Sequence, residues 1–347
     1  MSQQFKVAAV QAAPSFLNLA EGVERAVAYI EDAAKTGAKL VVFPETWLPG
    51  YPNHIWLGTV AWSMQFVGRY FENSVEVGSD ADKAIAAAAR KHGIQVSLGL
   101  SERDGGSLYI AQWHYDENGE IVQRRRKLKP THVERTVFGE GDGSDLAVNE
   151  TSIGRIGQLS CWEHLQPLSK YAMYAQNEQI HCAAWPNLAL YEGGAYALGH
   201  QVNNGASMVY AVEGGCFVIA ACALVSEQQR EMLCQGDPER EALCPVGGGY
   251  TRIYAPDGQD IGTNLPHTEE GLITADIDLG MIAFAKAAAD PAGHYARRDV
   301  TRLLLNGKRQ RPVVAFDDAA GLRAVADDDA EPSAEAPLME AKDHAAE

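Results

Sequence analysis

Short apolar runs rich in β-branched residues alternate along this chain with stretches of helical periodicity, and this alternation restricts the fold more than any other feature. Helical periodicity extends over residues 19–36 and 80–92, and Gly93 is placed to end the second helix before a strand at 94–100. Four further runs are predicted to be strands, at residues 6–12, 39–43, 180–185 and 216–222, and the run at 39–43 is typical of a buried strand. Strands that alternate with helices predict an α/β fold.

The middle of the chain has a different pattern, which is typical of antiparallel strands. Residues 107–128 alternate apolar and polar side chains on both sides of a turn at 116–119, and a similar pair of strands is predicted around the turn at 256–258. Another strand is predicted at 153–160, with helices at 168–177 and 196–212. Because the two halves share this order, we expect two mixed sheets packed face to face with helices outside, in one domain of residues 1–311.

Charge and composition exclude several classes of partner. The formal net charge of −17 argues against a nucleic-acid surface or an anionic membrane as partner, because both need clustered Lys and Arg. No run approaches the roughly 20 apolar residues of a membrane span, and the N-terminus lacks the features of a signal peptide. The 6 cysteines form no C-x-x-C pair, so we expect reduced thiols and a cytoplasmic location. Residues 312–347 are acidic and Ala-rich, which predicts a disordered tail.

Cys161 is the first candidate for chemistry. It follows a predicted strand, and a helix is expected shortly after it, so backbone N–H groups and a helix dipole would lower the pKa of its thiol. This position is typical of a nucleophile. A buried structural cysteine is the alternative, which this segment favours when it is taken alone.

Two other strand ends carry charged side chains. Glu45 follows the apolar strand at 39–43, and partial burial there would raise its pKa toward that of a general base. Lys127 and Lys129 lie near the end of the predicted hairpin, two residues apart and therefore on one face of a strand. Periodicity does not choose between the two lysines. A base, a cation and a nucleophile on separate strand ends are what attack on a carbon–nitrogen bond requires.

The motifs around these residues resemble those of the nitrilase (carbon–nitrogen hydrolase) superfamily. The resemblance rests on FPETWLPGYP at 43–52, RRKLKPTHVERTVFGEGDG at 125–143 and CWEHLQPLSKYA at 161–172, and it covers residues 6–307. It implies a four-layer α-β-β-α sandwich, with Cys161 as nucleophile, Glu45 as general base and Lys127 as catalytic cation. Glu134 matches a second active-site glutamate. The resemblance also implies that no metal or organic cofactor is needed, and that the chain associates with itself into dimers and larger spirals.

The CWEH sequence points to the nitrilase branch, and 45–58, 134–143 and 183–191 are most similar to bacterial arylacetonitrilases. A late motif at 290–300 is also typical of true nitrilases, although Arg298 stands where many relatives have proline. The expected reaction is hydrolysis of an arylacetonitrile or similar aromatic nitrile to the acid and ammonia through a cysteine thioimidate and thioester, with an amide as by-product. The alternatives within this superfamily are an aliphatic nitrilase, an amide-forming nitrile or cyanide hydratase, and an amidase.

Aromatic side chains in or beside these motifs are candidates for an apolar substrate slot, and ordinary core packing is the alternative. His132 lies between Lys127 and Glu134, where a contact with the site and a structural hydrogen bond are equally good interpretations. The candidate aromatic residues are Tyr51, Trp56, Trp162 and Trp185.

Three interpretations from other classes are weaker. A metal site could use Cys161, His164, His181 and Cys182, but their spacing matches no common zinc pattern, and adjacent strand residues point to opposite faces. A dinucleotide site at 139–145 lacks the G-x-G-x-x-G order and a preceding buried strand. A non-catalytic scaffold would not need a nucleophile, a base and a cation in matching motifs.

Overall fold

The computed structural model describes residues 3–191, 194–310, 313–317 and 321–324. The chain divides into two compact units, residues 1–308 and 309–347. In the second unit, β12 (Val314–Asp317) pairs antiparallel with β13 (Gly321–Ala324), two strands that the sequence analysis does not predict. Both strands fall within the predicted tail of residues 312–347. The predicted boundary at 311/312 and residues 325–347 of that tail lie outside the described residues, and the predicted division of the chain stays a prediction.

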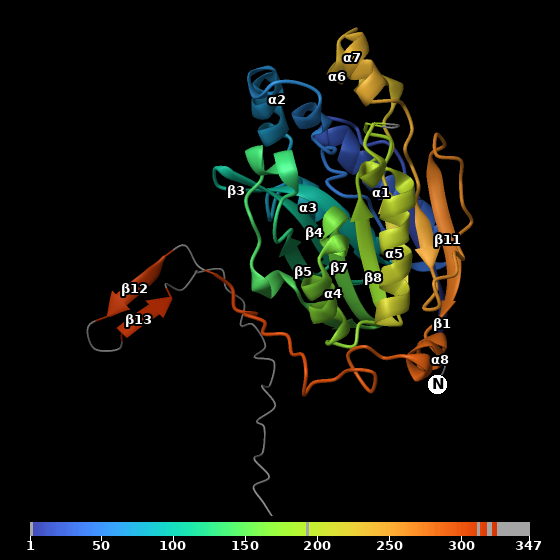
Figure 1. The fold of residues 1–347 in the computed structure, drawn as a ribbon. Coiled ribbons are helices and arrows are strands. Elements are labelled where there is room, and N and C mark those ends of the chain that lie inside the picture. Colours follow the sequence, from blue (N-terminus) through green and yellow to red (C-terminus); the bar gives the residue numbers. More distant parts are fainter. Residues whose placement is uncertain (1–2, 192–193, 311–312, 318–320, 325–347) are drawn as a thin grey trace, which may run out of the picture. The chain divides into compact units, whose positions relative to one another are not determined.

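The first unit contains two mixed sheets, and one of them has six strands in the order β11-β1-β2-β3-β4-β5 (Figure 1). β1 pairs parallel with β2 and β2 parallel with β3, whereas the pairs β11–β1, β3–β4 and β4–β5 are antiparallel. The hairpin predicted at 107–128 is confirmed as β4 and β5. The six strands are β11 (Gly271–Asp278), β1 (Gln4–Gln11), β2 (Ala38–Val42), β3 (Gln95–Asp104), β4 (Ser107–Tyr115) and β5 (Ile121–Arg126).

The other sheet has five strands in the order β10-β9-β8-β7-β6. Its three central strands run parallel, and both edge strands run antiparallel to their neighbours. The five strands are β10 (Arg252–Tyr254), β9 (Phe217–Cys222), β8 (Ile180–Trp185), β7 (Gly154–Ser160) and β6 (Val148–Thr151).

Alternation of side chains along the strands explains why the two sheets pack together with helices outside. Val7 and Ala9 of β1 lie in the core between the sheets, with Phe217 and Ile219 of β9. Ala8, the residue between them, faces a second core formed with α1 and α3. The outer face of the five-stranded sheet packs on α4 and α5. The predicted α-β-β-α order of four layers is therefore confirmed.

The helices extend the predicted pattern. None of the described helices has the length and apolar composition that crossing a membrane requires. Their bounds are α1 (Leu19–Lys35), α2 (Val60–Glu72), α3 (Asp80–His92), α4 (Pro167–Tyr174), α5 (His200–Gly214), α6 (Glu227–Cys234), α7 (Pro238–Leu243) and α8 (Met281–Ala288). The described part of the chain also contains five short 3₁₀ helices: η1 (Asn53–Trp56), η2 (His132–Thr136), η3 (Gly143–Asp145), η4 (Cys161–Leu165) and η5 (Tyr196–Leu198).

The second predicted hairpin differs from the structure. The second hairpin, predicted around 256–258, has only one regular strand, β10, because that strand pairs with β9 in the sheet. The arm after the turn returns through an isolated bridge between Tyr254 and Asp260. The chain then continues to β11, which crosses to the other sheet and pairs with β1.

Candidate active site

Glu45 lies in the loop that follows β2, with its side chain fully buried. Its backbone N–H donates to the carbonyl oxygen of Trp185 at 3.2 Å, which ties this loop to the end of β8 in the other sheet. A Cβ atom on Gly99 of β3 would lie 1.9 Å from the Pro44 carbonyl oxygen, so the loop can pack this closely only over glycine. Burial raises the pKa of the Glu45 carboxyl, as expected from the sequence.

Lys127 follows the last residue of β5, and its ammonium is held between two carboxylates. Its Nζ atom donates to Glu45 Oε1 at 2.9 Å and to Glu134 Oε2 at 2.8 Å. Burial by itself lowers the pKa of Lys127, but the carboxylates of Glu134 and Glu45 outweigh it and raise this pKa well above its usual value. Lys127 is therefore a buried cation at neutral pH.

Lys129 has a different environment, although periodicity suggested that both lysines share one strand face. β5 ends at Arg126, so neither lysine belongs to a strand. The Lys129 side chain is 61% exposed and pairs with Glu140 at the surface. Of the two lysines, only Lys127 lies in the cluster.

Glu134 is fixed by hydrogen bonds from several directions. It lies on η2, where the backbone N–H of Thr131 donates to its Oε2 atom at 2.6 Å. The hydroxyl of Tyr51 donates to Oε1 at 2.7 Å. Burial raises the pKa of Tyr51 well above its usual value, so its hydroxyl remains a donor. These contacts hold the carboxylate against the Lys127 ammonium.

Cys161 lies at the junction of β7 and η4, with φ of 50°. This left-handed conformation costs a non-glycine residue on the order of 1–3 kcal/mol, and strained residues of this kind cluster at functional sites. One ligand atom from each of Glu45, Glu134 and Cys161 forms a group in which all atoms lie within 4.8 Å of one another. The sulfur therefore lies beside both carboxylates.

The prediction that this junction lowers the pKa of the Cys161 thiol is wrong. Burial raises this pKa well above its usual value, and the nearby carboxylate of Glu45 raises it further. Lys127 and the backbone N–H of Trp162 act in the opposite direction but do not prevail. The thiol is therefore protonated at neutral pH and needs a base. Glu45 Oε2 has no hydrogen-bond partner in the described part of the chain, so it is the atom placed to accept that proton.

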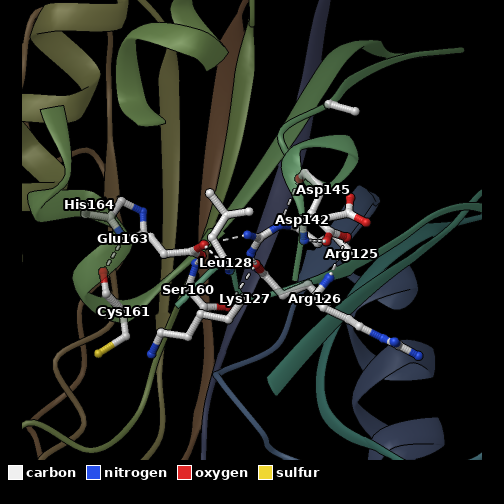
Figure 2. A network of polar contacts seen from close by, with 12 residues as sticks. Arg125, Arg126, Lys127, Leu128, Asp142, Asp145, Ser160, Cys161, Glu163 and His164 are labelled. Atoms are coloured by element: carbon white, nitrogen blue, oxygen red, sulfur yellow. Dashed lines mark hydrogen bonds and ion pairs between the residues drawn. The ribbon is translucent and has the colours of Figure 1, made fainter. Parts of the chain in front are cut away.

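A buried carboxylate connects the backbone at the nucleophile with the backbone at the cation (Figure 2). Glu163 accepts hydrogen bonds from the backbone N–H groups of Ser160 at 2.8 Å and Leu128 at 2.9 Å. Arg125 donates to the same carboxylate at 2.7 Å, and both side chains are buried. The pKa of Glu163 is lowered, because Arg125 and these N–H groups outweigh the effect of burial. Glu163 is thus an ionised brace between β5 and η4.

A cavity beside Cys161 has mainly apolar walls. Trp162 borders it and donates from its indole nitrogen to Asn203 Oδ1 at 3.1 Å, which fixes the orientation of the ring. Trp56 donates to the Tyr51 hydroxyl at 3.0 Å. The lining residues are Tyr51, Trp56, Thr131, Glu134, Cys161, Trp162, Pro186, Asn187, Leu188, Leu190, Leu198 and Asn203.

Two of the aromatic candidates lie outside this lining. The Trp185 ring is 1% exposed, stacks on His164 and donates to Ser207 Oγ, so it packs against the layer of helices behind the site. His132 stacks on Trp56 with ring centroids 5.6 Å apart and supports a wall of the cavity from outside. Tyr51, Trp56 and Trp162 are the predicted aromatic residues that border the cavity.

Sequence reasoning missed several residues at this site. Glu163 lies within the CWEH motif, and a carboxylate two residues after a candidate nucleophile was the available signal. Asn187 borders the cavity, and its Oδ1 atom is buried with no hydrogen-bond partner among the described residues. Nothing in the local sequence pattern distinguishes Asn187 from an ordinary loop residue.

A second cavity, of about 360 Å³, includes none of the clustered side chains. It lies beside η2 and is bordered by His54, Arg135 and Phe138 among others. It contains no Cys, Asp, Glu or Lys side chain. We therefore place the chemistry at the smaller cavity, which Cys161 and Glu134 of the cluster border.

The residues considered for a metal site do not form one group. Among the described residues, a cluster of three or more suitable ligands is found only at Glu45, Glu134 and Cys161. There, the Lys127 ammonium already occupies the cationic position between both carboxylates. His164 and His181 contact each other through their Nε2 atoms at 2.9 Å instead of converging with the cysteines.

This chain is similar to known proteins in sequence and in fold. The model of the carbon-nitrogen hydrolase family matches residues 6–287. The nitrilase of Pseudomonas syringae pv. syringae (strain B728a) is 54% identical over 318 residues, which is 92% of this chain and 94% of the relative. The arylacetone-specific nitrilase of Alcaligenes faecalis is 51% identical over 308 residues, or 89% of this chain and 86% of the relative. An amidase from Nesterenkonia sp. AN1, solved with acrylamide, superposes with a TM-score of 0.59 at 18% identity, covering 79% of this chain and 90% of the amidase.

Proposed function

This chain belongs to the carbon–nitrogen hydrolase family and is an enzyme that acts on carbon–nitrogen bonds, and on that premise we propose that it is a nitrilase with Cys161 as its nucleophile. The observation that carries the proposal is the buried cluster in which the Cys161 sulfur and the carboxylates of Glu45 and Glu134 approach within 4.8 Å. The Lys127 ammonium bridges the two carboxylates.

In the first half of the reaction, Glu45 takes the thiol proton and the Cys161 sulfur attacks the nitrile carbon. A carbon–sulfur bond forms, one π bond of the nitrile breaks, and the electron pair moves to nitrogen. The Lys127 ammonium stabilises this negative charge in a dry site, where such a contact contributes a few kcal/mol. The proton that Glu45 took from the thiol passes to this nitrogen, which gives a neutral thioimidate and restores the Glu45 carboxylate.

In the second half, Glu45 activates a water molecule that adds to the thioimidate carbon, giving a tetrahedral intermediate. If the carbon–nitrogen bond breaks, ammonia leaves and a thioester remains, which a second water hydrolyses to the acid while the Cys161 thiol is restored. If the carbon–sulfur bond breaks first, the product is the amide. Glu134, with Glu45 and Lys127, holds the nitrogen protonated and so favours release of ammonia.

An arylacetonitrile or similar aromatic nitrile is the proposed substrate. Support comes from the apolar walls of the cavity, where the Trp162 and Tyr51 rings and three leucines offer contacts to an aryl ring. The likeness to an arylacetone-specific nitrilase at 51% identity points the same way.

The direct test is to incubate the enzyme with phenylacetonitrile, an aliphatic dinitrile and phenylacetamide, and to quantify acid, amide and ammonia. We expect phenylacetic acid and ammonia as the main products. Turnover of phenylacetamide alone would contradict the nitrilase assignment, and a preference for the dinitrile would contradict the aryl preference. The Cys161→Ala variant is the matched control and should be inactive but folded.

Self-association and a cytoplasmic location belong to the same proposal. Exposed apolar side chains on α5 (Met208, Val209 and Val212) and Leu168 on α4 support contact between copies of the chain. Light scattering on the purified protein tests this, with a dimer or larger assembly expected. The six cysteines are all buried free thiols, which supports a reducing compartment.

A further inference from the structure

A chain of buried polar side chains leads from the backbone of Cys161 into the layer of helices. His164 Nδ1 lies 2.6 Å from the Cys161 carbonyl oxygen, and His164 Nε2 lies 2.9 Å from His181 Nε2. His181 Nδ1 lies 2.7 Å from Glu178 Oε1, and the Tyr210 hydroxyl donates to Glu178 Oε2 at 2.6 Å. None of these residues except Cys161 has a role in the reaction proposed above.

The ends of this chain fix the direction of every hydrogen bond in it. A carbonyl oxygen only accepts, so His164 must carry its proton on Nδ1, and its Nε2 atom accepts when the ring is neutral. His181 must then donate from Nε2, which leaves its Nδ1 atom as an acceptor. The remaining donor facing His181 Nδ1 is Glu178, which must therefore be a protonated carboxylic acid.

Burial favours this neutral arrangement over one with an imidazolium and a carboxylate. Burial raises the pKa of Glu178 to about 8 and lowers the pKa values of His164 and His181 well below the usual value for histidine. The contact with Tyr210 and the charge of Lys286 on α8 oppose the shift at Glu178 but do not cancel it. Other titratable or charged groups also act on this series of hydrogen-bonded side chains. They are Arg125, Tyr174, Cys182, Cys216 and Glu163.

Loss of the Glu178 proton must break one hydrogen bond of the chain. A Glu178 carboxylate requires the His181 proton on Nδ1, so His181 Nε2 becomes an acceptor. Two cases follow. In the first case, the lone pair of His181 Nε2 faces the lone pair of His164 Nε2 at 2.9 Å, and this hydrogen bond is lost. In the second case, His164 carries its own proton on Nε2 instead of Nδ1. His164 Nδ1 then turns a lone pair toward the Cys161 carbonyl oxygen at 2.6 Å.

We propose that Glu178 is a positioning residue which, through His181 and His164, holds the Cys161 carbonyl and thereby the left-handed backbone of the nucleophile only while its carboxyl carries a proton. This inference deepens the proposed function and rests on it for its kinetic consequence. The consequence is a fall in kcat at alkaline pH.

The kinetic test compares Glu178→Gln with Glu178→Ala across pH, using phenylacetonitrile. A glutamine amide donates to His181 and accepts from Tyr210 as the protonated carboxyl does, and it does not ionise. Glu178→Gln should keep kcat at neutral pH within about twofold of wild type and lose the alkaline fall. Glu178→Ala should lower kcat at all pH values by roughly tenfold or more, because it removes the donor to His181. The control is Tyr174→Phe, which touches Tyr210 but lies outside the chain, and should keep the alkaline fall.

A second measurement does not depend on nitrile turnover or on the folding of a variant. Nitrogen NMR of wild-type protein with labelled histidine reports the tautomers, and we expect Nδ1–H on His164 and Nε2–H on His181 at neutral pH, with a change of tautomer in one ring as Glu178 ionises. Inactivity of the wild type toward every nitrile would overturn the proposed function. The spectra would still test the predicted hydrogen bonds from Glu178 through His181 and His164 to Cys161. The inference is overturned if His164 carries its proton on Nε2 at neutral pH, if Glu178→Gln is as impaired as Glu178→Ala, or if its alkaline fall persists.

Discussion

Glu163 accepts a hydrogen bond at 2.9 Å from the backbone N–H of Leu128, the residue that follows Lys127. Glu163 itself stands two residues after Cys161, on η4. One carboxylate therefore sets the distance between the strand end that carries the cation and the turn that carries the nucleophile. Positions in a reactive cluster need such support, because small displacements of reacting groups cost large factors in rate.

Replacing Glu163 with alanine should destabilise the protein strongly. The substitution leaves Arg125 buried without its carboxylate, and breaking a buried ion pair in this way typically costs about 3–5 kcal/mol. Urea unfolding measures the change in the free energy of unfolding. The control is Lys35→Ala, which removes only exposed ion pairs with Glu31 and Asp32 and should destabilise the protein far less. Equal losses in the two variants would show that Glu163 is not a brace.

Lys127 and Lys129 should respond very differently to replacement by methionine. Lys127→Met removes the ammonium proposed to stabilise charge on the nitrile nitrogen, so kcat should fall by roughly 10²–10³-fold or more. Lys129→Met removes only a surface pair with Glu140 and should leave kcat near the wild-type value. Steady-state kinetics on phenylacetonitrile checks both. Comparable losses would mean that the cation is wrongly assigned.

The rate should fall as pH is lowered through about 8, the value to which burial raises the pKa of Glu45. Glu45 must be ionised to take the thiol proton, and burial raises its pKa above the ordinary value of 4.5. Activity is therefore present above this raised pKa and is lost as pH falls through it. The measurement is kcat/KM as a function of pH. The midpoint of its acid limb should lie at a pH well above the pKa of an ordinary carboxyl group. A midpoint at or below 4.5, the ordinary pKa of a glutamate, would contradict the assignment of Glu45 as the base.

Much of the fold could be predicted because the apolar pattern repeats in both halves of the chain. Runs such as KLVVF and IHCAAW are apolar on both faces, and this is the pattern that strands buried between a second sheet and a helix layer require. The pairing of β11 with β1 could not be predicted, because Val7 and its register partner Ala275 lie 268 positions apart (275 − 7), and local patterning does not encode contacts between such distant segments.

The cluster could be predicted in part. Glu45 and Cys161 stand at strand ends where their chemistry is visible in the sequence, whereas the choice of Lys127 over Lys129 came from family motifs and not from periodicity. The direction of the thiol pKa could not be predicted, because it depends on how deeply Cys161 is buried and on which carboxylates surround it. The contacts of Glu163 and Glu178 depend on tertiary packing of distant segments.

Trp162 should determine much of the preference for an aryl substrate. Replacing it with leucine removes an aromatic wall of the cavity and should lower kcat/KM for phenylacetonitrile by roughly tenfold, since aromatic contacts contribute about 0.5–1.5 kcal/mol beyond area burial. The value for an aliphatic dinitrile should change less. Trp62→Leu on α2, outside the cavity lining, is the control and should leave the ratio of the two substrates unchanged. An unchanged ratio in the Trp162 variant would exclude this wall from substrate selection.

The central claim is that a covalent bond forms between the Cys161 sulfur and the nitrile carbon. Mass spectrometry of enzyme quenched during turnover of phenylacetonitrile, followed by peptide mapping, tests it most directly. We predict an adduct with the mass of the thioimidate or thioester on the peptide that contains Cys161, and no adduct in the Cys161→Ala variant. Turnover by the Cys161→Ala variant, or an adduct on another cysteine, would contradict the claim.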